Sequence, residues 1–245
     1  MSTSQRSAFL TRVASAVRAG NHYREAAHAE VPAGVGYLGA GDDPIGRLVD
    51  ELRLVGACPY RVHAAEELHA AVRNIVARFA VRRAVCKTAG VVLELGVPEL
   101  LRAAGVEVST ADELAALDEP TRRDRVFAAD LGVAAPDWAI AETGSLVYAS
   151  GPEQTRSATL LPPVHLAIVH ASRVIADLLE LPERLQQRAV ASVVPRNVAL
   201  VTGPSKTGDI ELRLTTGVHG PGEVHVLIWE GEGGMTNDEA RMTKE

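Results

Sequence analysis

The chain has 245 residues, of which 47% are hydrophobic and 23% charged, proportions typical of a globular protein and unlike those of disordered or fibrous chains. Its formal net charge of −6 provides no basic surface for counterion release from a polyphosphate, so we expect no nucleic-acid partner. Residues 1–20 lack the apolar core of a secretory signal, and no apolar run approaches the roughly 20 residues of a membrane span. We therefore expect a cytoplasmic protein with no membrane span.

The N-terminal part is predicted to be helical. Apolar residues recur every three to four positions over residues 4–29, and they do so again over residues 45–54, after a loop rich in Gly and Pro. We interpret residues 1–60 as an N-terminal helical arm or subdomain, residues 61–230 as the main α/β domain and residues 231–245 as a disordered tail.

Predicted helices and strands alternate through the main domain. This alternation indicates an α/β fold with a mostly parallel sheet and flanking helices. The predicted helices cover residues 64–80, 98–104, 122–131 and 174–190. The predicted strands cover residues 83–87, 106–109, 138–150 (two runs broken by Thr143-Gly144-Ser145), 164–170, 197–202 and 223–229.

The two cysteines, Cys58 and Cys86, lie far apart in the sequence. Their spacing predicts neither a disulfide framework nor the ligand set of an iron–sulfur cluster, so we expect no cofactor in this chain. The histidines His165, His219 and His225 have no recognisable metal-ligand spacing, and we predict no metal site from the sequence.

The most distinctive segment is Thr202-Gly-Pro-Ser-Lys-Thr-Gly-Asp-Ile-Glu211, which follows a predicted strand. Loops at the carboxyl ends of strands usually carry the ligands of open α/β sheets, and the start of a following helix offers N–H groups to an anion. The order of its residues is not that of a Walker A loop, so ATP binding is not expected. The alternative is a helix start capped by Ser205 or Thr207. We predict as ligand-binding residues Gly203, Pro204, Ser205, Lys206, Thr207 and Asp209.

A second segment, Ala141-Glu-Thr-Gly-Ser145, places a carboxylate at a break between two strands. Glu142 is a candidate catalytic base, nucleophile or ligand contact, and Thr143, Gly144 and Ser145 are candidate ligand-binding residues. The alternative is a glutamate whose carboxylate accepts hydrogen bonds from the backbone of its own turn.

Charged residues elsewhere supply further candidates. Only three of the 25 basic residues are lysines, and two of them, Lys87 and Lys206, follow strand-like runs, where a lysine can serve as a compact titratable charge. The alternative is chance placement. Arg156 is a candidate anion ligand, although a solvated surface arginine is the simpler interpretation.

Two histidines receive different interpretations. His219, within the loop Gly217-Val-His-Gly-Pro221, is a candidate acid, base or donor, or else a loop histidine with no fixed role. His165 is interpreted as a packed, hydrogen-bonded residue rather than a metal ligand.

Together these segments resemble the LutC/YkgG-type lactate-utilization family, whose members carry a LUD domain. The resemblance covers about residues 60–230 and departs from the family pattern at Lys206, where arginine is commoner, and at Gly208, where alanine is commoner. The segments that carry it are Ala141-Glu-Thr-Gly-Ser-Leu-Val147, Leu160-Leu-Pro-Pro-Val-His165, Thr202 to Glu211 and Gly217 to Pro221.

The resemblance implies a fold similar to the NagB/RpiA/CoA-transferase-like group. It also implies a component of a system that oxidises L-lactate to pyruvate, beside partner proteins that bear the iron–sulfur clusters. Within that system we expect a subunit that binds a small anionic metabolite or acts on it. The alternatives are a non-catalytic assembly protein and an independent acyl- or CoA-transferring enzyme that uses Glu142.

Overall fold

The computed structural model describes residues 3–25, 39–87, 90–150, 157–191, 195, 197–208 and 214–231. By its internal contacts the chain divides into two units, residues 1–38 and residues 39–245. The first unit contains helix α1 (Thr3–Glu25), in agreement with the predicted N-terminal helix. None of the described helices combines the length and the apolarity needed to cross a bilayer. The predicted disordered tail lies outside the described residues from residue 232 onward.

The second unit is built on a six-stranded sheet with the order β1-β12-β7-β4-β2-β3, in which every neighbouring pair is parallel. This arrangement confirms the predicted α/β class with a mostly parallel sheet. β7 and β12 are almost continuous apolar runs because both faces of the sheet are covered. The strands are β1 (Cys58–Val62), β2 (Arg83–Cys86), β3 (Glu107–Thr110), β4 (Leu131–Ala134), β7 (Val164–His170) and β12 (Glu223–Trp229).

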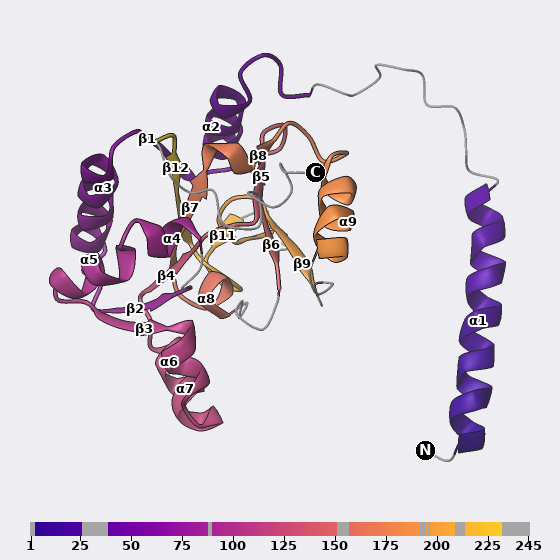
Figure 1. Cartoon of the computed structure of the whole chain (residues 1–245). Coiled ribbons are helices and arrows are strands. Elements are labelled where there is room, and N and C mark those ends of the chain that lie inside the picture. The colour runs from indigo at the N-terminus through magenta and orange to yellow at the C-terminus, as the bar shows by residue number, and fades with distance from the viewer. Residues whose placement is uncertain are drawn as a thin grey trace. The chain divides into compact units, whose positions relative to one another are not determined.

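Helices α3 (Ala65–Arg78), α4 (Val91–Glu94) and α5 (Val97–Ala103) cover one face of this sheet (Figure 1). α3 buries Leu68, Val72 and Ile75, which recur at helical spacing and pack with Leu166 and Leu227 of the sheet. Helix α2 (Pro44–Leu54) packs on the other face, where Leu48, Val49 and Leu52 join Val226 and Ile228 in a second core. The sheet is therefore held between two apolar cores.

The boundary of the main domain lies earlier in the chain than residue 60. β1 is a strand of the six-stranded sheet, and α2 packs on it, so residues 39–60 belong to the same unit as the sheet. β1 escaped prediction because its five residues, Cys-Pro-Tyr-Arg-Val, show no clear alternation of apolar and polar side chains.

A four-stranded sheet with the order β8-β5-β6-β9 shares the core of α2. β5 and β6 form an antiparallel hairpin whose turn contains Gly144, as the break in the predicted strands indicated. β9 extends it antiparallel to β6, and β8 pairs parallel with β5. The strands are β5 (Trp138–Ile140), β6 (Ser145–Ala149), β8 (Val174–Ile175) and β9 (Val198–Val201).

The predicted helix over residues 174–190 is wrong in its first half. Val174 and Ile175 form β8, and helix α9 (Leu181–Ala191) begins only after a turn. In that turn the Asp177 carboxylate accepts hydrogen bonds from the backbone of Leu179, at 2.7 Å, and of Glu180, at 3.2 Å. These local bonds compete with the helix and delay its start.

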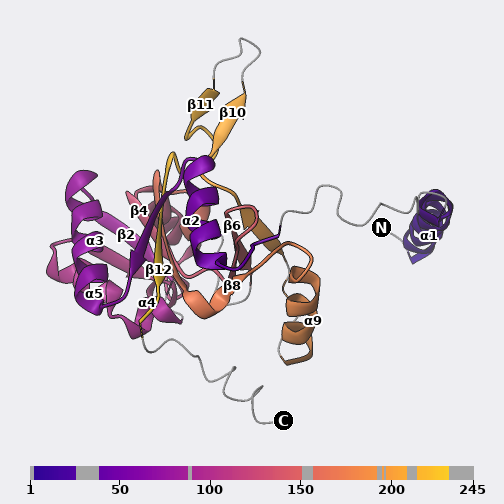
Figure 2. The same ribbon diagram turned by 90° about the horizontal axis from the view of Figure 1, so that it is seen from above.

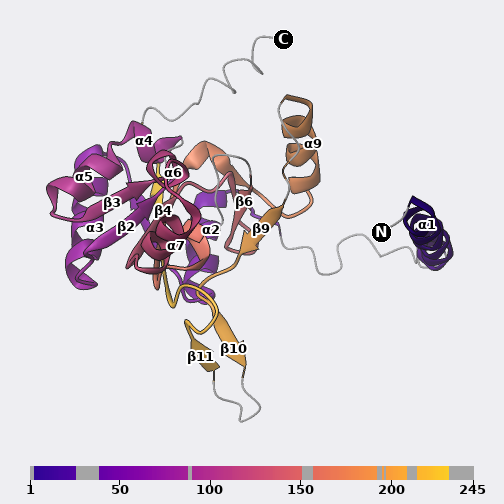
Figure 3. The ribbon, with the colours of Figure 1, turned by 90° about the horizontal axis from the view of Figure 1, so that it is seen from below.

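The segment after β9 is not a helix start, so the capping interpretation is wrong. Lys206–Gly208 forms β10, which pairs antiparallel with β11 (Leu214–Thr216). Figures 2 and 3 show this hairpin projecting from the body of the unit. The remaining described elements are α6 (Ala111–Ala115), α7 (Glu119–Phe127), α8 (Ser157–Leu160) and the 3-10 turn η1 (Ala171–Arg173).

His165 lies in β7 with no exposed surface, as predicted for a packed histidine. Its Nδ1–H donates to the carbonyl of Gly132 at 3.1 Å, and its Nε2 lies 2.7 Å from the hydroxyl of Tyr148, which donates to it. Burial lowers the pKa of His165 to about 4. The ring is therefore a neutral, fully bonded part of the core.

This burial predicts that acid destabilises the protein. Because the pKa of His165 is about 4 in the folded chain and 6.5 ordinarily, its contribution is complete above pH 6.5 and is lost as the pH falls toward 4. The loss is about 3 kcal/mol in the free energy of unfolding. Urea titrations at several pH values should show a shallower decline for His165→Gln than for the native chain. His219→Gln, at an exposed histidine, is the control; equal declines for the native and His165→Gln proteins would contradict the prediction.

Candidate functional site

The predicted site segments meet at the edge of the six-stranded sheet where β7 and β12 begin, which we call the amino edge. Backbone N–H groups of Gly222 and Glu223 donate to the carbonyl of Pro163, at 3.0 and 3.3 Å, immediately before those strands. Figure 2 shows the β10–β11 hairpin at one end of the sheet and α4, which follows β2, at the other.

This location corrects the expected one. The segment after Val201 does leave the carboxyl end of a strand, but that strand, β9, belongs to the four-stranded sheet. Its continuation leads through the β10–β11 hairpin to the start of β12, so it reaches the amino edge of the six-stranded sheet rather than its carboxyl edge. We call residues 142–145, 202–207 and 217–222 the glycine-rich surface.

Three hydroxyl groups connect the β5–β6 turn with the end of β9. β6 pairs with both strands, which brings Ser145 beside Thr202. Thr143 Oγ1 donates to Ser145 Oγ at 2.8 Å, and Ser145 Oγ lies 2.7 Å from Thr202 Oγ1. Ser145 is buried, so this row of hydroxyls is fixed in position.

Two glycines allow these turns to approach α2 closely. Gly144 has φ of +63°, and a Cβ there would lie 2.8 Å from the backbone carbon of Glu51. Gly203 has φ of +76°, and a Cβ there would lie 2.6 Å from the carbonyl oxygen of Val55. Both the backbone angle and the space exclude a side chain.

Ser205 joins the hairpin to the loop that contains His219. The Ser205 N–H donates to the carbonyl of Pro221 at 2.8 Å, and the Gly217 N–H donates to the carbonyl of Ser205 at 2.9 Å. His219 itself is exposed on this loop. The glycine-rich surface thus consists of chain segments joined by backbone and side-chain hydrogen bonds, with His219 exposed on its loop.

The two lysine candidates lie apart. Lys206 is exposed, and its Nζ donates to the carbonyl oxygen of Val55, just after α2, at 2.6 Å. Lys87 is buried at the carboxyl end of β2, where its Nζ donates to the carbonyl of Ala135 at 3.1 Å. The structure therefore assigns Lys206, and not Lys87, to the glycine-rich surface.

Glu142 occupies the β5–β6 turn and is half-buried. Its backbone N–H donates to the carbonyl of Ala176 at 3.0 Å, which anchors the turn on the segment after β8. Thr207 is half-buried in β10 opposite Thr215, and Pro204 is half-buried beside Gly56. Arg156 and Asp209 lie outside the described residues.

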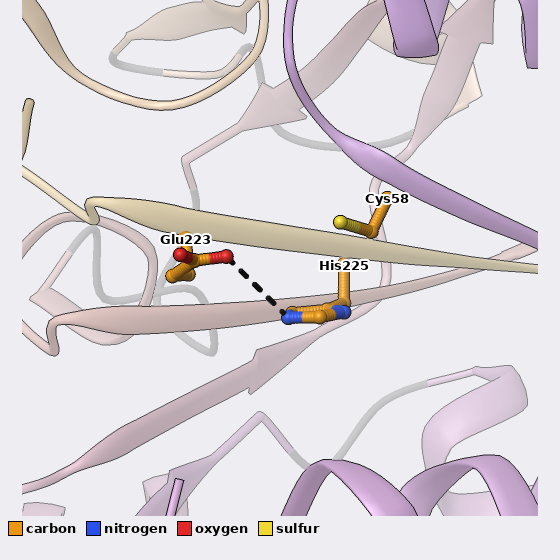
Figure 4. Close-up of side chains that lie close together, drawn as sticks. All are labelled: Cys58, Glu223 and His225. Carbon is orange, nitrogen blue, oxygen red and sulfur yellow. Dashed lines mark ion pairs between the residues drawn. The ribbon is translucent and has the colours of Figure 1, made fainter. Parts of the chain in front are cut away.

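Sequence reasoning missed a second group of polar side chains at the amino edge, formed by Cys58, Glu223 and His225 (Figure 4). Cys58 and His225 are register partners on the adjacent strands β1 and β12, and Glu223 precedes His225 by two residues on the same face. The sequence alone could have placed Glu223 and His225 on the same face, because residues two apart in a strand point to the same side. Cys58 joins them only through the pairing of β12 with β1, which was not predicted to be a strand.

An open groove of about 610 Å³ runs along β1 and α3. Its lining includes Tyr60, His63, Glu67 and Arg78, and none of the predicted site residues. This groove therefore lies apart from the glycine-rich surface, which is identified by its contacts and chemistry.

Residues 45–229 match the model of the LUD domain family. The chain is 38% identical over 98 residues to Uncharacterized protein NMB1437 of Neisseria meningitidis, covering 40% of this chain and 41% of that protein. It is 29% identical over 157 residues to Lactate utilization protein C of Halalkalibacterium halodurans, covering 64% and 66%. It is 38% identical over 103 residues to Uncharacterized protein YkgG of Escherichia coli, covering 42% and 45%. The matches therefore span less than two-thirds of the length of these curated relatives.

A solved structure of a DUF162 family protein from Deinococcus radiodurans is similar in fold. The TM-score is 0.53 at 20% sequence identity, and the match covers 76% of this chain and 96% of that one. At this identity the similarity shows the fold alone.

Because Gly203 lies so close to Val55, just after α2, we expect that the one methyl group added by Gly203→Ala destabilises the folded protein. Gly203→Ala should lower the free energy of unfolding by about 1 to 3 kcal/mol more than Gly41→Ala. Gly41 is the matched control because its φ is +66° but nothing lies within 4 Å of an added Cβ. Urea denaturation of both variants measures the difference. Equal losses would show that the β9–β10 segment does not press on Val55.

Proposed function

The chain belongs to the LUD domain family, and from that premise we propose that it is a component of an L-lactate utilization system and binds a small anionic metabolite at the glycine-rich surface. Relatives named Lactate utilization protein C, from Halalkalibacterium halodurans and Bacillus licheniformis, support the first part. The convergence of the 142–145, 202–207 and 217–222 segments at one place supports the second.

The chemistry of the glycine-rich surface suits a carboxylate ligand. An ammonium group has three N–H donors, and Lys206 uses one of them on Val55, so two remain for a ligand. Thr143, Ser145 and Thr202 add hydroxyl groups, each of which can donate or accept. A positive charge on the same surface as these hydroxyls suits a hydroxy acid or keto acid such as lactate or pyruvate.

The oxidation of lactate to pyruvate releases electrons that need an acceptor. Cysteine-ligated iron–sulfur clusters require several thiolates, whereas this chain has two cysteines, and the pKa of the buried Cys86 thiol is raised by burial to about 12. We propose that the clusters belong to partner proteins and that this chain acts beside them in the cytoplasm. Whether it turns the ligand over or presents it to a partner is decided by an assay of the isolated chain.

Lys206→Ala should weaken the binding of lactate or pyruvate by about ten- to a hundredfold, because a charge-assisted hydrogen bond to a ligand contributes about 1.5 to 3 kcal/mol. The free energy of unfolding should fall by no more than about 1 kcal/mol, since the lost bond to Val55 is exposed to solvent. Lys206→Arg should retain most of the binding. Isothermal titration with each anion, and L-lactate-dependent growth of a deletion strain that carries each variant, provide the measurements.

Arg73→Ala is the charge-matched control, because Arg73 is an exposed residue of α3 on the opposite face of the sheet. It should bind and grow like the native chain. If Lys206→Ala also does so, Lys206 only ties the hairpin to Val55, and the ligand-binding part of the proposal fails. Loss of growth with normal anion binding would instead support a role in assembly with partners.

A further inference from the structure

The amino edge holds three different metal-ligating groups within reach of one ion. The thiol of Cys58, a carboxylate oxygen of Glu223 and a ring nitrogen of His225 all lie within 4.8 Å of one another (Figure 4). Donors that share one zinc ion at about 2.0 to 2.3 Å lie about 3.5 Å apart, so closing the group needs side-chain shifts on the order of 1 Å. The backbone is already in register, because Cys58 and His225 are Cα partners.

The imidazole of His225 points an unsatisfied nitrogen into this group. His225 has no exposed surface, yet its Nε2 has no hydrogen-bond partner. The nearest carboxylate oxygen, Glu223 Oε2, lies 4.0 Å away, which is too far for a hydrogen bond. A buried ring nitrogen without a partner is costly, and such an atom calls for a ligand that the protein atoms do not supply.

We propose that Cys58, Glu223 and His225 bind one divalent transition metal ion of intermediate softness, with Zn²⁺ as the reference ion. One thiolate, one imidazole and one carboxylate form a donor set suited to this class of ion rather than to Ca²⁺ or Mg²⁺. The site lies outside the glycine-rich surface and does not depend on the proposed role in lactate utilization. It also replaces the expectation, based on the spacing of histidines along the chain, of no metal site.

The charges and protons balance at this position. Binding breaks the S–H bond of Cys58, releases that proton to solvent and forms a sulfur–metal bond, so thiolate and carboxylate together neutralise the dication. Tyr60 occupies Nδ1 of His225, and Nε2 has no partner, so Nε2 is the ring nitrogen open to the metal. A neutral site tolerates the nearby guanidinium of Arg78.

The surroundings of His225 suit a metal ligand whose other ring nitrogen is held by a hydrogen bond. Tyr60 Oη lies 3.0 Å from Nδ1, and the ring stacks on Tyr60 and meets Phe79 edge-on. When Nε2 binds the metal, Nδ1 carries the proton, and its N–H donates a hydrogen bond to Tyr60 Oη. This bond fixes the tautomer and the orientation of the ring. The side chain of Glu223 is 45% exposed, so solvent reaches this group and a water molecule would be available as a fourth ligand.

The test uses the full chain, freed of metal with a chelator and titrated with Zn²⁺ and with Co²⁺. We expect one equivalent of each to bind, a thiolate-to-cobalt charge-transfer band to appear, and Zn²⁺ to raise the unfolding midpoint. Cys58→Ser should abolish the band, and Glu223→Gln, at a partly exposed residue, should weaken Zn²⁺ binding at least about tenfold. Tyr60→Phe should weaken it by about ten- to a hundredfold through the lost support of Nδ1.

His63→Gln is the control, because this exposed histidine follows β1 at the opposite edge of the sheet. It should bind both ions like the native chain. Zn²⁺ should also protect Cys58 from alkylation by iodoacetamide, whereas Cys86 is buried and should react in neither state.

Three outcomes would overturn the proposal. They are the absence of stoichiometric binding, a cobalt spectrum without thiolate character, and equal Zn²⁺ affinity in the native chain and Cys58→Ser, which would indicate an adventitious ion on surface groups. In the first case the group is only a packed part of the sheet, with His225 held by the hydrogen bond between its Nδ1 and Tyr60.

Discussion

The C-terminal end of α2 supports both groups at the amino edge, the glycine-rich surface and the Cys58 cluster, by which we mean Cys58, Glu223 and His225. Gly144 and Gly203 bring two turns into backbone contact with Glu51 and Val55, at distances that no side chain allows. Lys206 donates to the same Val55 carbonyl, and β1 starts three residues later at Cys58. The stretch from Glu51 to Cys58 contacts both turns and leads directly into β1. It therefore helps to position both the glycine-rich surface and the Cys58 cluster.

The proposed use of the amino edge differs from the usual geometry of open α/β sheets, in which ligands bind outside the carboxyl ends of strands. Two of the charged side chains at the carboxyl edge of this sheet have partners within the chain. Arg61 holds Glu230 through two hydrogen bonds of 2.7 Å, and Lys87 donates to Ala135. At the amino edge, by contrast, His225 retains an unsatisfied nitrogen and Lys206 retains donors. The buried, unpartnered nitrogen of His225 is the feature that sets the amino edge apart among these groups.

The elements that the sequence predicted well are those whose patterns are local. Leu68, Val72 and Ile75 mark α3 by helical spacing, and the apolar run from Val164 marks β7. β8 and β10 could not be predicted, because two or three residues carry no period and become strands only by pairing with β5 and β11. The same limit applies to the site. The hydroxyls of Ser145 and Thr202 stand in segments of recognisable composition, whereas Cys58 acquires its partners only through the register of β1 with β12.

The loop over residues 217–222 connects the β10–β11 hairpin to Glu223 of the Cys58 cluster through the chain and through hydrogen bonds. Pro221 accepts the hydrogen bond of Ser205, which precedes Lys206, and two residues later Glu223 begins β12 as part of the Cys58 cluster. Gly222 is held to Pro163, so the short link between Pro221 and Glu223 has little freedom to absorb a displacement. Glu223 is thus tied to Ser205 through Pro221 and to the start of β7 through Pro163, while His225 lies two residues further into the buried sheet. Glu223 directly follows the glycine-rich surface in the chain, and Cys58 follows Val55, which that surface contacts, by three residues, so both are placed by their links to it.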